Sequence, residues 1–264
     1  MALLDAIRLT INRFSYFEVY DGLPNVIHRD LILARIRNRE TVNLNNYIIN
    51  GDINLTQLNI AHVNGMIPIS TPIIITNSQI LGELNFSNVR FSNTIDLRGS
   101  IVCGRTSFDG SIFNQPCHFN NAHFFGAVTL NRTEFNYIAV VDFSKAEFKL
   151  YTECLGARFP RSASFNECIF IGYVLFNGST FTGISNFTGT IFKDRTDLGN
   201  QTQSTWFSGT KFCKEAYFQD VRLNIMLSSL RQNLKSRQLL KVLSFSNQQL
   251  LGKPYSKVKQ SSAK

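Results

Sequence analysis

Large apolar residues recur along most of the chain in alternating steps of five and six positions, which gives a period of 11 residues. The pattern begins at Leu44 and ends at Leu223, with an irregular patch at residues 61–72 and slips of register at residues 136–142 and 199–206. A turn-like pair such as Asp109-Gly110 often follows a large residue. A second column, two positions before every other large residue, holds only small side chains, namely Ser111, Ala122, Thr133, Ala146, Ala157, Cys168, Ser179, Thr190 and Thr210.

This unit predicts very short extended segments that alternate with tight turns. Residues two positions apart point to the same side of an extended segment, and Gly or Asn accepts the positive φ of a type II turn. Because a strand so short gains stability only by stacking on a copy of itself, we predict coils of about 22 residues with four short sides, paired at about 4.8 Å. We expect the interior ladder to contain Phe86, Phe91, Phe108, Phe113, Phe119, Phe124, Phe135, Phe143, Phe148, Phe159, Phe165, Phe170, Phe176, Phe181, Phe187, Phe192, Phe207, Phe212 and Phe218.

Two other folds show related patterns. An 11-residue repeat is also typical of right-handed helical supercoils, but this segment is rich in Asn, Gly, Thr, Ser and Phe rather than in helix formers. A β-sandwich would show longer strands at irregular spacing. The pattern therefore favours an all-β solenoid.

The repeated units FDGSIF, FNNAHF, FNGSTF and FTGTIF resemble those of the pentapeptide-repeat family, and the alternating spacing resembles its subgroup with the consensus F-x-G-A-x-F. The resemblance covers roughly residues 30–223, although Cys154 and Leu198 stand where Phe is typical. It implies a right-handed quadrilateral β-helix. Some members of the family imitate DNA and block a type II topoisomerase, and some members of the subgroup carry membrane channel segments after the repeats.

Both ends of the chain differ from the repeats, so we divide it into an N-terminal helical cap (1–43), a β-helix (44–223) and a basic C-terminal segment with a disordered tail (224–264). Short helical caps are expected at both ends, because the edges of a stack of strands need cover. Near the N-terminus, apolar residues at helical spacing predict one helix, and Asp30 is expected to be the N-cap of a second. The apolar stripe of the first helix consists of Leu3, Leu4, Ile7, Ile11 and Phe14.

The C-terminal segment has its own stripe, in which Leu223, Leu227, Leu230 and Leu234 follow helical spacing. A basic amphipathic helix can bind an anionic membrane or a partner, and it can equally cap the last coil with its charges in water. We favour the cap. The residues that would make the alternative contact are Arg231, Lys235, Arg237 and Lys241.

The net charge of +9 is concentrated in that segment. Residues 44–223 carry 13 basic and 13 acidic side chains, whereas residues 224–264 carry eight basic and none that is acidic. DNA mimicry needs a strongly acidic surface, because duplex DNA has one charge per about 1.7 Å. A neutral repeat region therefore disfavours nucleic-acid-related functions.

Residues that could carry chemistry do not cluster in the sequence. The five cysteines form no CxxC pair, and we expect buried free thiols in a reducing compartment. His118 and His123 lie near Cys117, but both are expected to point outward, so no metal or cofactor is predicted. Asp96 and Asp142 are weak candidates for a carboxylate pair, and a solvated surface explains them better. No Walker loop, GxSxG or HExxH motif occurs.

These observations favour a non-catalytic interaction scaffold, with no enzymatic activity. We expect a protein partner of unknown identity, and a homodimer is a further option. Nucleic acid is not expected as a partner, and the alternatives are a DNA-mimicking topoisomerase inhibitor or a peripheral membrane protein held by residues 224–264. Asp5 and Arg8 interrupt the apolar run that a secretion signal would need, so we expect a cytoplasmic protein, with membrane association as an option.

Overall fold

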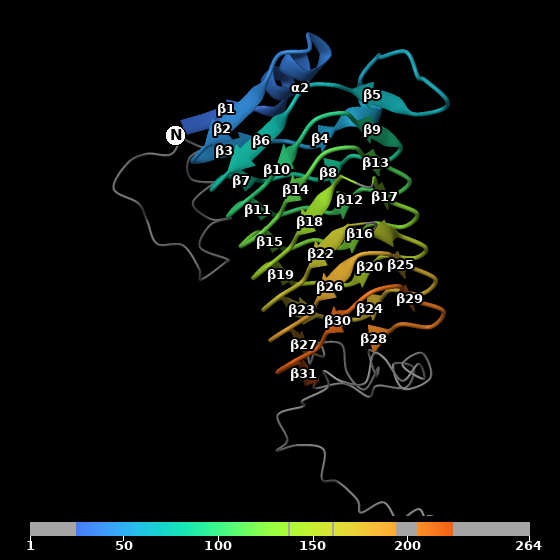
Figure 1. Cartoon of the computed structure of the whole chain (residues 1–264). Coiled ribbons are helices and arrows are strands. Elements are labelled where there is room, and N and C mark those ends of the chain that lie inside the picture. Colours follow the sequence, from blue (N-terminus) through green and yellow to red (C-terminus); the bar gives the residue numbers. More distant parts are fainter. Residues whose placement is uncertain (1–24, 137, 160, 194–204, 224–264) are drawn as a thin grey trace, which may run out of the picture.

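The computed structural model describes residues 25–136, 138–159, 161–193 and 205–223. These residues form a column of stacked coils in which every coil contributes short strands to four parallel sheets, which we call sheets A, B, C and D (Figure 1). The chain visits the sheets in the order B, A, C and D before it returns to B one coil further along. The predicted all-β solenoid is therefore confirmed.

Sheets A and B contain the longer strands. Sheet A consists of β1 (Asn25–His28), β3 (Tyr47–Asn50), β7 (Gln79–Ile80), β11 (Ile101–Val102), β15 (His123–Phe124), β19 (Glu147–Phe148), β23 (Ile169–Ile171), β27 (Ile191–Lys193) and β31 (Arg222–Leu223). Sheet B consists of β2 (Val42–Asn45), β6 (Ile73–Thr76), β10 (Ile95–Asp96), β14 (Cys117–His118), β18 (Val140–Asp142), β22 (Ser162–Ser164), β26 (Ile184–Asn186) and β30 (Ala216–Tyr217).

Sheets C and D have seven strands each and are built almost entirely from two-residue strands. Sheet C consists of β4 (Ile53–Asn54), β8 (Leu84–Asn85), β12 (Thr106–Ser107), β16 (Val128–Thr129), β20 (Thr152–Glu153), β24 (Val174–Leu175) and β28 (Thr205–Trp206). Sheet D consists of β5 (Ile67–Ile69), β9 (Val89–Phe91), β13 (Ile112–Phe113), β17 (Glu134–Phe135), β21 (Arg158–Phe159), β25 (Thr180–Phe181) and β29 (Lys211–Phe212). A 3₁₀ turn, η1 (Leu55–Gln57), follows β4.

The irregularities of the sequence pattern appear as longer corners between strands. Ile95 pairs with Cys117, 22 positions later, but Cys117 pairs with Val141, 24 positions later. The two extra residues fall between β17 and β18, where Ile138 is exposed. In the first coil, 31 positions separate Leu44 from its partner in β6, and the excess forms the loop before β5 (Figure 1). Leu198 and most of the second slip lie outside the described residues.

The interior holds stacked columns of phenylalanine rings. In sheet D, the ring of Phe113 lies 4.8 Å from that of Phe91 and 4.9 Å from that of Phe135, with nearly parallel planes. Every member of the expected ladder is buried except Phe212, which is half-buried and lies in the last described coil. Burial of each phenylalanine contributes about 1.5–3 kcal/mol, so this ladder is the main source of stability.

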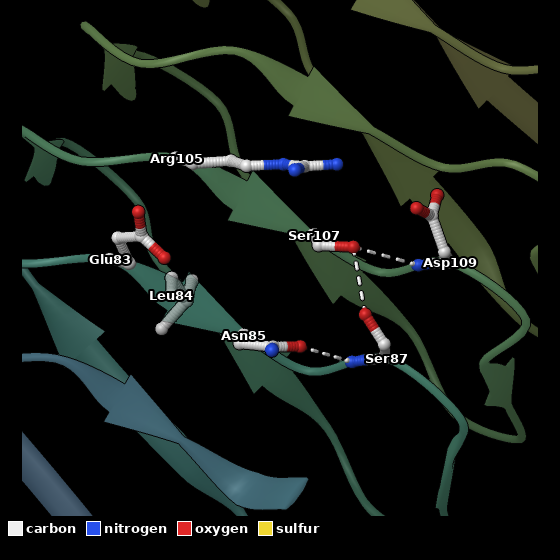
Figure 2. Close-up of a pocket in the computed structure, with 7 residues that line it drawn as sticks. All are labelled: Glu83, Leu84, Asn85, Ser87, Arg105, Ser107 and Asp109. Atoms are coloured by element: carbon white, nitrogen blue, oxygen red, sulfur yellow. Dashed lines mark hydrogen bonds between the residues drawn. The ribbon is translucent and has the colours of Figure 1, made fainter.

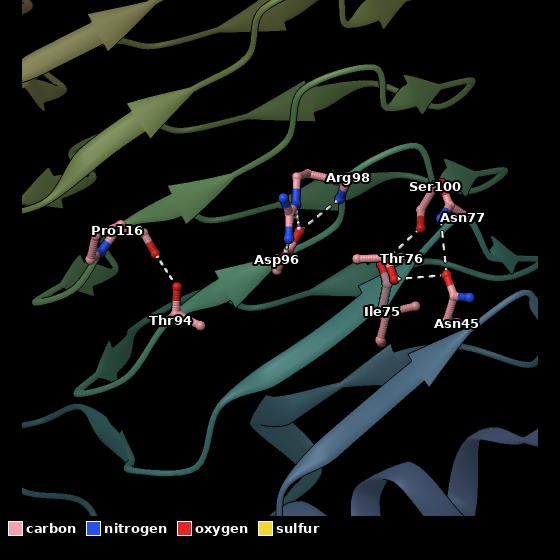
Figure 3. Close-up of polar contacts among 9 residues, drawn as sticks. All are labelled: Asn45, Ile75, Thr76, Asn77, Thr94, Asp96, Arg98, Ser100 and Pro116. Atoms are coloured by element: carbon pink, nitrogen blue, oxygen red, sulfur yellow. Dashed lines mark hydrogen bonds and ion pairs between the residues drawn. The ribbon is translucent and has the colours of Figure 1, made fainter.

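The small column has a hydrogen-bonding role in addition to its packing role. The hydroxyl of Thr133 donates to the carbonyl of Phe108 at 2.9 Å, and that of Thr190 donates to the carbonyl of Phe165 at 2.6 Å. Figure 3 shows the corresponding contact from Ser100 to the carbonyl of Ile75, at 2.8 Å. A small side chain fits beside the rings, and a hydroxyl there binds the carbonyl at which the preceding coil turns.

The corners from sheet B to sheet A and from sheet C to sheet D each place one residue in the left-handed region. Gly110 has φ of 66°, as a type II turn requires, and its neighbour Ser111 donates its backbone N–H to the carbonyl of Phe108 at 3.0 Å. Lys145 and Glu167 occupy the same position with φ of 61° and 56°. The stacking of the coils therefore imposes this conformation even where the side chain disfavours it.

Helix α2 (Arg29–Arg37) covers the N-terminal end of the stack, with Ile32, Leu33 and Ile36 buried in the core (Figure 1). The expected N-cap is wrong: His28 caps the helix, because its extended backbone ends β1 and its ring accepts the N–H of Asp30. The pairing of strands also begins before residue 44, since β1 pairs with β3 and β2 begins at Val42. The expected helices in residues 1–24 and 224–264 lie outside the described residues.

Candidate functional site

The outer surface of sheet C carries a continuous row of polar side chains. Each strand directs its first residue inward, as the buried Leu84 and Val128 show, and its second residue outward. The outward residues and their neighbours beyond the strand lie above one another on successive coils. We call this surface the sheet C strip, and it consists of Asn85, Ser87, Ser107, Asp109, Thr129, Asn131, Glu153 and Tyr173.

Hydrogen bonds fix the side chains in the N-terminal half of the strip. The side-chain oxygen of Asn85 accepts the N–H of Ser87 at 3.1 Å, and the hydroxyls of Ser87 and Ser107 are 2.8 Å apart, as Figure 2 shows. On the next coil, the hydroxyl of Thr129 donates to Ser107 at 3.1 Å and to Oδ2 of Asp109 at 3.0 Å. Three coils are thus joined through their outer side chains.

The C-terminal half of the strip continues the same network of hydrogen bonds. Asp109 accepts the backbone N–H of Asn131 through Oδ1 at 2.7 Å. The amide of Asn131 donates to Oε2 of Glu153 at 3.1 Å, and the hydroxyl of Tyr173 donates to Oε1 of Glu153 at 3.0 Å. The ring of Tyr173 is stacked on that of Tyr151 at 4.9 Å. The network therefore extends from β8 to the residue preceding β24.

A shallow depression of about 190 Å³ lies at the N-terminal end of the strip. Glu83 and Arg105 border it together with members of the strip, and both side chains point across it in Figure 2. Arg105 is exposed, so its guanidinium is available to a carboxylate or phosphate of a partner.

The carboxylates of the strip are engaged as acceptors. Both oxygens of Asp109 and both oxygens of Glu153 accept hydrogen bonds. Burial, followed by the nearby Glu153 carboxylate, raises the pKa of Tyr173 to about 12, so the phenol is a donor at neutral pH. This arrangement suits recognition of polar groups better than proton transfer.

Asp96 and Asp142, the weak candidates for a carboxylate pair, lie on sheet B and form no site, and the expectation of a solvated Asp96 is wrong. Asp96 is only 4% exposed and binds the guanidinium of Arg98, with Oδ2 2.6 Å from Nη2 (Figure 3). Oδ1 of Asp96 also accepts the backbone N–H of Arg98 at 3.1 Å. Asp142 accepts the N–H of Ser144 at 2.9 Å, which is a turn contact. Both residues stabilise local structure.

The five cysteine thiols differ in their burial. Cys117, Cys154 and Cys168 are buried, and burial raises the pKa of each above its ordinary value. Cys103 is half-buried and Cys213 is exposed, so the expectation that all five are buried is wrong for these two. Both occupy outward positions that directly follow an inward residue of a strand, which the pattern of large and small columns does not describe.

The two histidines near Cys117 in the sequence lie on different sheets. His118 is in sheet B and His123 in sheet A, where Nδ1 of His123 lies 3.1 Å from a carboxylate oxygen of Glu147. Lys149 binds the other oxygen of that carboxylate, and the His123 contact, followed by those of Lys149, lowers the pKa of Glu147 to about 2. Among the residues that the structure describes, no three His, Cys, Asp or Glu side chains form a group that could hold a metal ion.

The sequence pattern did not identify the sheet C strip. Its signal was present as polar residues that recur 22 positions apart, such as Ser107 and Thr129 or Asp109 and Asn131. Polar residues also recur on the outside of the other sheets, so this signal does not single out one surface. The candidate contacts of the C-terminal segment, Arg231, Lys235, Arg237 and Lys241, lie outside the described residues.

Comparison with known proteins agrees with this architecture. The sequence model of the family described as "Pentapeptide repeats (9 copies)" matches residues 86–134 and 155–200. Neither the curated proteins nor the solved structures provide a match to the chain. Within the described ranges, no helix has the length and apolarity to cross a membrane. Because the family model matches these two blocks and the stacked coils run through both, the chain carries pentapeptide repeats over residues 86–134 and 155–200.

Proposed function

We propose that this protein is a non-catalytic interaction scaffold whose sheet C strip docks a protein partner. The observation that carries the proposal is the hydrogen-bonded network from Asn85 to Tyr173. A polar surface that is already ordered pays little further conformational entropy when it binds. The rigid stack beneath it holds donors and acceptors at fixed intervals of about 4.8 Å.

The chemistry of the described side chains supports a role without catalysis. The carboxylates of Asp109 and Glu153 are occupied by hydrogen bonds, and the thiols of Cys117, Cys154 and Cys168 are buried. A catalytic base or nucleophile needs access to substrate and a pKa suited to its task. These groups, engaged in hydrogen bonds or buried, lack that access.

The charges favour a protein partner over mimicry of nucleic acid. Asp96 pairs with Arg98, Glu147 with Lys149, and Glu167 with Lys145 at 3.8 Å. A surface that replaces duplex DNA needs a run of unneutralised acidic groups. Arg105 borders the same depression as Asp109, at the N-terminal end of the strip. A supercoiling assay in which micromolar protein inhibits a type II topoisomerase would contradict this part of the proposal.

The test is a capture experiment with two matched charge reversals. Arg105→Glu changes the margin of the sheet C strip, and Arg158→Glu changes an exposed arginine on sheet D. We expect cross-linking in native extract to join a protein to the wild type and to Arg158→Glu but not to Arg105→Glu. The purified partner should then bind Arg105→Glu at least about tenfold more weakly, which is about 1.4 kcal/mol.

Two results would overturn the proposal. Equal capture by Arg105→Glu and Arg158→Glu would show that the strip does not contact the partner. Turnover of a substrate that one polar surface substitution abolishes would show that the protein is an enzyme.

A second candidate role is peripheral membrane binding through residues 224–264. The charge of that segment supports it, since it holds eight basic residues and no acidic ones. Each basic residue near an anionic membrane contributes about 1 kcal/mol. Co-sedimentation with phosphatidylserine vesicles tests it, and equal pelleting of the full chain and of a chain that ends at residue 223 would exclude it.

A further inference from the structure

The outer surface of sheet A holds more apolar side chains than those of the other three sheets. Sheet A lies along the left side of the stack in Figure 1. Its outward positions form a surface that we call the sheet A stripe, composed of Leu81, Ile101, Cys103, Ile169, Ile171 and Ile191, all half-buried. The outward positions of the adjoining sheet B are mainly polar, as Asn43 and Thr76 show, although they include Ile74 and the exposed Ile184.

Charged residues in the middle of the stripe neutralise one another. Glu147 binds both His123 and Lys149, which lie between Cys103 and Ile169 in the stack. Because the carboxylate and the ammonium already form a pair, this band does not prevent an apolar segment from packing across the stripe.

Two outward residues near the N-terminal end of sheet A are already withdrawn from solvent. Ile48 pairs with Gln79, and Gln79 pairs with the outward Ile101, so all three point away from the core. Ile48 and Gln79 are nevertheless only 5% and 6% exposed, and Ile48 is not part of the contiguous core. The outside of the sheet is therefore covered over β3 and β7, although Val26, the partner of Ile48 in β1, is 45% exposed.

The position at which residues 1–24 join the described chain indicates what covers it. They lead directly into β1, the first strand of sheet A, at the corner that sheets A and B share. From that corner a segment can extend over the polar sheet B or over the apolar sheet A. Its apolar residues at helical spacing, Leu3, Leu4, Ile7, Ile11 and Phe14, match only the second surface.

The length of a helix in this segment also agrees with the length of the sheet A stripe. A helix over residues 3–14 would be about 18 Å long at 1.5 Å per residue. The strands from β7 to β27 span five intervals in sheet A, or about 24 Å. We propose that residues 1–24 pack in cis across the sheet A stripe as an amphipathic segment. This cover leaves the sheet C strip free, so the inference does not depend on the proposed function.

Two native thiols allow a direct test in the full-length protein. Cys103 belongs to the stripe, where Nε2 of Gln79 lies 3.7 Å from its sulfur, and the exposed Cys213 lies beyond the last strand of sheet D as an internal reference. The rate at which N-ethylmaleimide modifies each thiol is measured by peptide mass spectrometry. Ile7→Asp places a charge in the apolar face of the segment, and Arg13→Asp places the same residue on its opposite face.

We expect Ile7→Asp to increase the Cys103 rate by about tenfold, because the cover opens, while the Cys213 rate and the far-ultraviolet spectrum stay unchanged. Arg13→Asp should leave both rates as in the wild type. Unchanged Cys103 reactivity in Ile7→Asp would overturn the proposal. Protection of Cys103 that grows with protein concentration, together with a dimer mass by light scattering, would also overturn it and would assign the stripe to a second copy of the chain.

Discussion

Replacement of Phe165 by alanine tests the interior ladder at its centre. Phe165 is 1% exposed, and its ring is stacked between Phe143 at 5.3 Å and Phe187 at 4.9 Å. It also contacts Phe159 and Phe176 edge to face, at 5.9 and 5.6 Å. Phe165→Ala removes all of these contacts at once and leaves a cavity between coils that are tied together by their backbones.

The expected loss of unfolding free energy is about 3–5 kcal/mol, the usual range for a fully buried phenylalanine. Phe165→Leu keeps most of the volume and should lose only about 1–2 kcal/mol. Phe212→Ala, in the half-buried position of the last described coil, should lose about 1–2 kcal/mol. Urea unfolding followed by circular dichroism measures all three, provided that the dependence on urea concentration is unchanged.

The relative losses of unfolding free energy in the three variants test whether the ladder is the main source of stability. If Phe165→Ala loses less than about 1 kcal/mol, or no more than Phe212→Ala, the ladder is not the main source of stability. Hydrogen exchange gives a second measure, because a stacked repeat responds most strongly in the coils next to the substitution.

Three further predictions concern the corners, the small column and the acidic range. Gly126→Ala should lower the unfolding free energy by about 1–3 kcal/mol, because its Cβ would lie 2.2 Å from the carbonyl oxygen of Gly104 on the preceding coil. Thr133→Val should cost about 1 kcal/mol in urea unfolding, because the hydrogen bond to a carbonyl of the preceding coil is lost. The pKa of Glu147 lies at about 2 instead of 4.5, so its stabilising contribution is complete above pH 4.5 and is lost as the pH falls toward 2. Glu147→Gln should therefore be less stable than the wild type at pH 7 and lose less stability on acidification.

Each of these predictions has a contrary outcome. An unchanged melting temperature of Gly126→Ala would show that the coils separate at that corner without cost. Thr106→Val is the matched control for Thr133→Val, since the buried hydroxyl of Thr106 has no hydrogen-bond partner among the described residues. This control should be neutral or stabilising, and an equal loss in both variants would contradict the role given to the hydroxyl. Parallel acid profiles of the wild type and Glu147→Gln would refute the assignment of Glu147.

The period of the sequence was sufficient to predict the solenoid and its buried side chains. Inward and outward directions alternate locally along an extended segment, so large residues such as Phe108 and small ones such as Ser111 reveal their position without reference to other coils. The segment that follows Asp30 was likewise predicted to be a helix, although the capping residue depended on how β1 ends at His28.

Contacts between outward side chains required the tertiary structure, because they depend on the number of residues in each coil. The two extra residues between β17 and β18 pair Thr129 with Glu153 across 24 positions, whereas Ser107 and Thr129 pair across 22. A local pattern does not show whether such an insertion shifts the register or extends a corner. The continuity of the sheet C strip follows from that register. The sequence by itself determined which residues face the core, and only the stacking of the coils decided which polar residues meet on the surface.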